Sequence, residues 1–186
     1  MQIRKRLYMI AAPLIIAGVN IPITQAAERA DTQLTLQMEV VHITCLINDG
    51  VGINQQVYLP LVSQTELRAD TAKSGLAKLI VDCSSSSNTP ADITVRLTPV
   101  GGASVVGSGA DGILKTDLSG VALKIVWNSD GQPVSLVPGN ATVFSPSASD
   151  PLRWDLSFLV TPKMISGEQL GSGHYKSALQ INIVYS

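Results

Sequence analysis

The two cysteines and two histidines, Cys45, Cys83, His42 and His174, are the residues best suited to metal or redox chemistry. A zinc or copper site needs three or four ligands, and the two histidines are far apart in the sequence, each flanked by strand-like residues. We therefore expect no metal site. In an exported chain, two cysteines favour one intramolecular disulfide between Cys45 and Cys83. Closing such a loop stabilises a fold by about 4 kcal/mol in the chain-entropy model.

Hydrolytic chemistry has little support among the remaining residues. Ser108 lies in a Gly-Ser-Gly turn without a nucleophile-elbow motif, and no motif places a histidine beside an activated serine. Asp111, Asp117 and Asp130 are suited to turns and solubility. We expect no catalytic residues, no cofactor and hence no enzyme.

The first 26 residues have the three parts of a secretory signal. A basic segment from Arg4 to Arg6 precedes an apolar stretch from Leu7 to Val19, and Ala26 provides a small residue for cleavage. The apolar stretch is shorter than the roughly 20 residues that span a membrane, which disfavours the alternative of an N-terminal anchor. We predict a signal peptide over residues 1–26 and a mature chain from Ala27.

The charge of the mature chain excludes some partners. Three of the 13 basic residues lie in the signal peptide, so residues 27–186 carry ten basic against 14 acidic residues, a net charge of −4. Without a basic cluster, we expect no binding to nucleic acid. The length fits one domain with a real core.

Most of the mature chain alternates between apolar and polar residues, as half-buried strands do. Turn clusters rich in Gly, Asn, Asp and Pro separate these segments, and residues 63–74 fit one short helix. The pattern predicts an antiparallel sandwich of immunoglobulin type, although no Trp lies between the cysteines. The expected strands lie at residues 34–45, 57–59, 76–83, 93–98, 121–127, 141–144, 154–160 and 175–185.

The two ends of the mature chain are the most informative. The C-terminal segment places five large apolar or aromatic side chains on one face, and its other edge has no following strand to pair with. The N-terminal segment, residues 27–37, begins polar and then alternates through Leu34 and Leu36. The five C-terminal residues are Tyr175, Leu179, Ile181, Ile183 and Tyr185.

These ends resemble a known family. Gly173 is fourteenth from the C-terminus and Tyr185 is penultimate, which is similar to the chaperone-binding signature of type 1 and P pilus subunits. Residues 30–36 resemble the donor extension of minor tip-fibrillum subunits, and residues 39–41 resemble the first strand of main rod subunits. The chain is thus identified as a chaperone–usher pilus (fimbrial) subunit, and its donor segment favours a minor subunit.

The resemblance implies a fold and partners. The fold would be an all-β, incomplete immunoglobulin-like sandwich that lacks its last strand, with a donor-strand extension at residues 27–37 and a pilin domain at residues 38–186. The missing strand would leave a groove beside the strand from Gly173 to Tyr185. A periplasmic chaperone would fill this groove first. At the outer-membrane usher, the extension of a neighbouring subunit would replace it, a form of β-augmentation, and yield an extracellular adhesive pilus.

The donor strand would insert the side chains of Thr32, Leu34, Leu36 and Met38. Family donors often carry Gly where this chain has Met38, so the neighbour's groove would need a larger pocket there or a shifted register.

Two alternatives compete with a polymerising subunit. A two-domain adhesin would need a longer chain, and a self-contained exported β-sandwich binding module would fold alone and stay monomeric.

Overall fold

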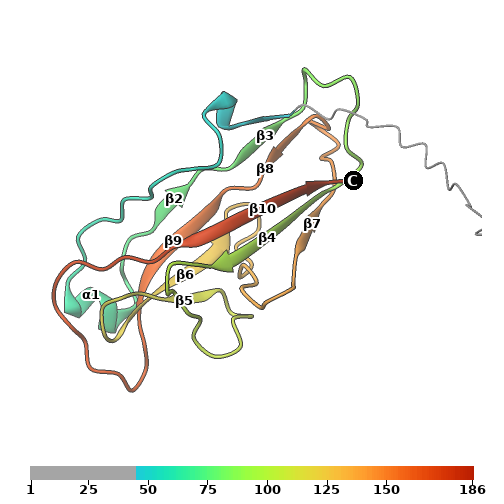
Figure 1. Cartoon of the computed structure of the whole chain (residues 1–186). Helices are drawn as coiled ribbons and strands as arrows, with labels where there is room; N and C mark the ends of the chain where they lie inside the picture. Colours follow the sequence, from blue (N-terminus) through green and yellow to red (C-terminus); the bar gives the residue numbers. More distant parts are fainter. Residues whose placement is uncertain (1–44) are drawn as a thin grey trace, which may run out of the picture. The chain divides into compact units, whose positions relative to one another are not determined.

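The computed structural model describes residues 45–186 (Figure 1). The chain divides by its contacts into two units, Met1–Met38 and Glu39–Ser186, and the described residues all belong to the second. Ten short strands, one α-helix and one 3-10 helix make up this part. The strands are β1 (Leu46–Ile47), β2 (Gly75–Ala77), β3 (Ile80–Asp82), β4 (Ile93–Pro99), β5 (Ile113–Lys115), β6 (Val121–Trp127), β7 (Thr142–Phe144), β8 (Arg153–Asp155), β9 (Phe158–Met164) and β10 (Leu179–Tyr185).

All strand pairs are antiparallel, and the fold is all-β and immunoglobulin-like, as predicted. One sheet has the order β10-β4-β7, and a second has the order β2-β9-β6-β5. A third small sheet, β1-β3-β8, adjoins the second because β2 leads into β3 and β8 leads into β9. Figure 1 shows β4 and β10 side by side in front of β6 and β9.

The core lies between these sheets. On β4 the inward side chains of Ile93, Val95 and Leu97 are no more than 3% exposed, and they belong to one cluster with residues of β6 and β9. Trp127 contacts Phe144 and Phe158 edge to face, with ring centroids 4.8 and 6.1 Å apart. The packing of the inward residues accounts for the alternation along β4, and the strands at β4 and β6 were predicted correctly.

Two predicted strands are each divided in two. Residues 76–83 form β2 and β3, and residues 154–160 contribute to β8 and β9. The breaks face each other, because Leu156 N donates to Leu79 O at 2.8 Å and Leu79 N donates to the buried Ser157 Oγ at 3.0 Å. The chain changes sheets here, and continuous apolar runs do not reveal such a change.

The α-helix of the described residues, α1 (Gln64–Ala69), lies within the predicted range. Its start is a capping box, in which Glu66 N donates to Ser63 Oγ at 3.1 Å and Ser63 N donates to Glu66 Oε2 at 2.7 Å. Asp70 ends the helix with φ 55°. The 3-10 helix η1 (Asn48–Gly50) follows β1.

Candidate binding groove

β10 is an edge strand of its sheet within the described chain. It pairs with β4 from Leu179↔Pro99 to Tyr185↔Ile93. At the two ends, Ala178 O accepts from Val100 N at 3.1 Å, and Ser186 N donates to Asp92 O at 3.1 Å. Even-numbered residues therefore direct their backbone groups to β4. In an antiparallel ladder the odd-numbered residues direct theirs to the opposite side, where no described strand pairs with them.

The inward face of β10 is less covered than that of β4. Its side chains, at Leu179, Ile181, Ile183 and Tyr185, pack against the core cluster yet are only half-buried. Three of their four cross-strand neighbours on β4, Ile93, Val95 and Leu97, are fully buried. The same sheet face is thus closed over β4 and open over β10.

Residues 53–58 form a wall that faces this open edge. Residues 53–59 run past β2 without pairing with it, so the strand predicted at residues 57–59 is wrong. Val57 and Leu59 nevertheless pack on the core, whereas Tyr58 is 83% exposed. The wall comes so close to β2 that a Cβ on Gly75 would lie 3.3 Å from Tyr58 O. Side chains hold it here, including Gln55 Nε2, which donates to Lys78 O at 2.7 Å.

Between the two walls lies a groove of about 950 Å³. One wall is the segment 53–58, and the other runs from Tyr175 to Ile181. The groove reaches the core, because its lining includes core side chains of β2, β5, β6 and β9. These are Ala77, Leu114, Leu123, Ile125, Phe158 and Val160.

The segment before β10 is held by the β5–β6 loop. Asp117 accepts from Lys176 N through its Oδ1 at 2.8 Å and donates from its own N to Lys176 O at 3.1 Å. Ser177 Oγ donates to Lys115 O at 2.7 Å. Residues 175–178 therefore stay in line with β10 although they are not part of its ladder, and β10 begins four residues later than the predicted strand.

Glu168 holds the preceding loop to the same place. Its Oε1 lies 3.1 Å from Lys115 Nζ, and its Oε2 accepts from Gly120 N at 3.2 Å. The hydrogen bonds from Lys115 and Gly120 lower the pKa of this carboxyl from its ordinary value. The ionised carboxylate is therefore the form that these two contacts favour.

The predicted C-terminal site residues have different surroundings. Tyr175, Leu179 and Ile181 line the groove, whereas Ile183 and Tyr185 pack on the core further along β10. Gly173 has φ +138°, which L side chains rarely adopt, and nothing lies within 4 Å of the place of its missing Cβ. The predicted donor residues Thr32, Leu34, Leu36 and Met38 lie outside the described residues.

Burial affects the two groove-strand tyrosines. It raises the pKa of both Tyr175 and Tyr185 above the ordinary phenol value. Each ring therefore lies against apolar surface in its neutral form.

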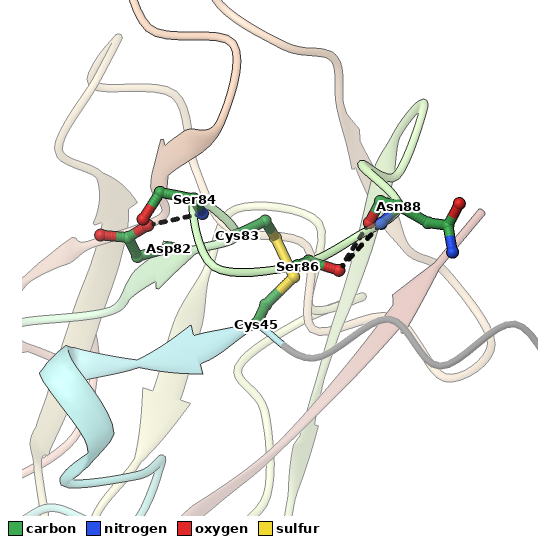
Figure 2. The surroundings of a disulfide bond; sticks show 6 residues. All are labelled: Cys45, Asp82, Cys83, Ser84, Ser86 and Asn88. Carbon is green, nitrogen blue, oxygen red and sulfur yellow. Dashed lines mark hydrogen bonds between the residues drawn. A yellow bond between two sulfur atoms is a disulfide. The ribbon is translucent and has the colours of Figure 1, made fainter.

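The predicted disulfide is present. Cys45 and Cys83 are bonded, with their Cα atoms 4.2 Å apart, and join the start of β1 to the end of β3 (Figure 2). Ser84 N donates to Asp82 Oδ1 at 2.9 Å beside the bond, and hydrogen bonding by Ser84 lowers the pKa of Asp82. The disulfide thus ties the start of β1, which leads towards the wall at residues 53–58, to the end of β3.

Neither a metal-binding cluster nor a membrane-spanning helix is found in residues 45–186. This range contains no group of three or more His, Cys, Asp or Glu residues that could hold a metal ion. No described helix is long and apolar enough to cross a membrane.

Comparison with known proteins places the fold. No protein-family model matches the chain, and no curated protein matches it. Among solved structures, one reported as a chaperone–usher pilus that reveals the molecular basis of rod uncoiling has a TM-score of 0.60 at 18% identity, covering 94% of this chain and 100% of its own. The crystal structure of the P pilus rod subunit PapA has a TM-score of 0.57 at 18% identity, covering 83% of this chain and 100% of its own. The described chain has the fold of chaperone–usher pilus rod subunits.

Proposed function

We propose that this chain is a non-catalytic structural subunit of an extracellular chaperone–usher pilus and polymerises by donor-strand exchange. The observation that carries the proposal is the groove of about 950 Å³ between β10 and residues 53–58, on a fold that pilus rod subunits share. A groove of this kind leaves apolar side chains and backbone groups without partners.

An added strand would satisfy both needs. Its backbone would pair with the odd-numbered residues of β10, and alternate side chains would enter the groove. Residues 27–37 fit this task, because a strand of about ten residues spans roughly 33 Å, similar to the stretch from Tyr175 to Tyr185. Burying Leu34 and Leu36 would contribute about 1.5–3 kcal/mol each.

We propose a route to the cell surface that uses the same groove. After removal of residues 1–26, a periplasmic chaperone would fill the groove of the exported chain and prevent aggregation. The outer-membrane usher would then exchange the chaperone strand for residues 27–37 of a neighbouring subunit. The chain would in turn insert its own extension into the next groove, and a fibre would grow.

A covalently filled chain tests the proposal without an identified chaperone. We would append a second copy of residues 27–40 after Ser186 through a short glycine-containing turn, which directs the copy back along β10. We call this protein the filled chain. It should be monomeric, and its melting temperature should exceed that of the mature chain by about 10 °C, at 2–4 °C per kcal/mol for a chain of this size.

A matched control carries Leu34→Asp and Leu36→Asp in the appended copy only. It should lose the gain in melting temperature, because charged side chains cannot enter an apolar groove without a large penalty. Equal melting temperatures for the mature, filled and control chains, with all three monomeric, would contradict the proposal. That result would favour the self-contained β-sandwich.

A further inference from the structure

We infer, on the basis of the proposed function, that Asp117 is a positioning residue that extends the strand-accepting edge of the groove beyond β10. The ladder between β10 and β4 begins at Leu179↔Pro99. The groove, however, is lined from Tyr175 onward. Something other than β4 must therefore align residues 175–177, because the last bond on that side joins Val100 N to Ala178 O.

Asp117 takes the place of a pairing strand at this point. In the ladder, an even-numbered residue of β10 gives both backbone groups to β4. Lys176 gives both of its backbone groups to Asp117, with Lys176 N donating to Oδ1 at 2.8 Å and Lys176 O accepting from Asp117 N at 3.1 Å. The alternation thus continues from Ala178 to Lys176, and the odd-numbered Tyr175 and Ser177 direct their backbone groups to the groove.

The loop that carries Asp117 is itself well braced. Thr116 Oγ1 donates to Val121 O at 2.8 Å and accepts from Leu118 N at 3.2 Å. On the neighbouring segment, Gly171 N donates to Ser119 O at 2.9 Å. An aspartate on a braced loop can fix the strand segment, whereas the Ser177 side-chain bond to Lys115 fixes one side chain only.

Hydrogen exchange tests this role residue by residue. The mature chain would be measured alone and with an excess of a synthetic peptide of residues 27–40, on the monomeric fraction from size exclusion. Peptide binding should slow exchange at least about tenfold at the amides of Tyr175, Ser177, Ile181 and Ile183, whose odd-numbered positions direct their N–H groups away from β4. In Asp117→Ala, the slowing should vanish at Tyr175 and Ser177 and persist at Ile181 and Ile183.

Two further variants separate positioning from general damage. Asp117→Asn keeps an oxygen acceptor for Lys176 N and should restore most of the protection. Asp111→Ala removes an exposed acid from a neighbouring turn and should behave like the unchanged chain. Uniform loss along the whole edge in Asp117→Ala, or no loss anywhere, would overturn the role of Asp117. Absence of any protection in the unchanged chain would instead count against the proposed function.

Discussion

At the residue scale, two glycines with nearly the same backbone conformation differ in what surrounds them. Gly120 has φ +72°, and a Cβ there would lie 2.5 Å from Gln169 O. Gly131 has φ +70°, with nothing within 4 Å. Gly120 therefore allows the loop of Glu168 to approach the β5–β6 loop, whereas Gly131 serves only a turn.

Substituting each glycine by alanine separates conformation from contact. Gly131→Ala should lower the free energy of unfolding by about 1–2 kcal/mol, the cost of a left-handed conformation. Gly120→Ala should cost at least about 2 kcal/mol more, because backbone atoms must move. Urea unfolding of both variants measures the difference. Equal losses would show that the close approach at Gly120 is readily relaxed.

The tyrosines on the groove strand predict an alkaline dependence of stability. Because burial raises the pKa of Tyr185, the folded protein holds the phenol proton more tightly than the unfolded chain. The stability that this tighter proton binding contributes is complete below the ordinary pKa of about 10, and it is lost as pH rises through the raised value. Tyr185→Phe should therefore lose less stability than the unchanged chain between pH 8 and about 11, the range that spans the ordinary phenol pKa.

Urea midpoints at the two pH values measure this effect. The matched control is Tyr58→Phe, which removes the same hydroxyl from a residue that is 83% exposed. An equal effect of both substitutions would refute the link to burial at β10.

At the element scale, β10 should respond to filling of the groove on one face only. Ile181 lines the groove half-buried, so Ile181→Ala should cost about 1–2 kcal/mol in the mature chain and about 2–4 kcal/mol in the filled chain. Val184 lies on the opposite face and is 53% exposed, so Val184→Ala should change stability by less than about 0.5 kcal/mol in both the mature and the filled chain. Denaturant unfolding of the four variants and of the two unchanged chains measures these costs. A cost for Ile181→Ala that is the same in both backgrounds would mean that the donor does not cover this side chain.

Elements with one partner on each side could be predicted from alternation, and elements that change partners could not. β4 and β6 each pair with one neighbour over all seven residues, β10 and β9 respectively, and on β4 the period of two matches the burial. The runs that end in Cys83 and Val160 pass from one sheet to another, and burial on both sides of the crossing conceals the break. At the start of β10, alternation continues through residues 175–178, although Asp117 replaces β4 as the partner.

Of the two walls of the groove, only the C-terminal segment has a clear pattern in the sequence. The pattern of odd-numbered residues in the C-terminal segment identified the strand that lines it. The other wall, residues 53–58, was interpreted only in part, as a short strand at residues 57–59. Its position depends on side-chain contacts with β2, which leave no periodic signal in the sequence.

At the scale of the whole molecule, the disulfide connects folding stability to the groove. The wall at residues 53–58 and the segment that leads to it have few backbone hydrogen bonds to strands of the described chain. β1 pairs with β3 over two residues, and residues 53–59 pair with no strand. The Cys45–Cys83 bond holds the start of β1, upstream of the wall at residues 53–58. A chain without this bond should keep its core and lose the alignment of the wall.

The double variant Cys45→Ala/Cys83→Ala should lose about 4 kcal/mol of unfolding free energy, the entropy of closing a loop of 38 residues. Leu156→Ala, in the core and 1% exposed, should lose a comparable 2–5 kcal/mol without affecting the wall. Affinity for the peptide of residues 27–40, measured by calorimetry well below both melting temperatures, should fall only in the cysteine variant. If both variants bind the peptide equally, the disulfide stabilises the fold without shaping the groove, because only a displaced wall can weaken binding at equal stability.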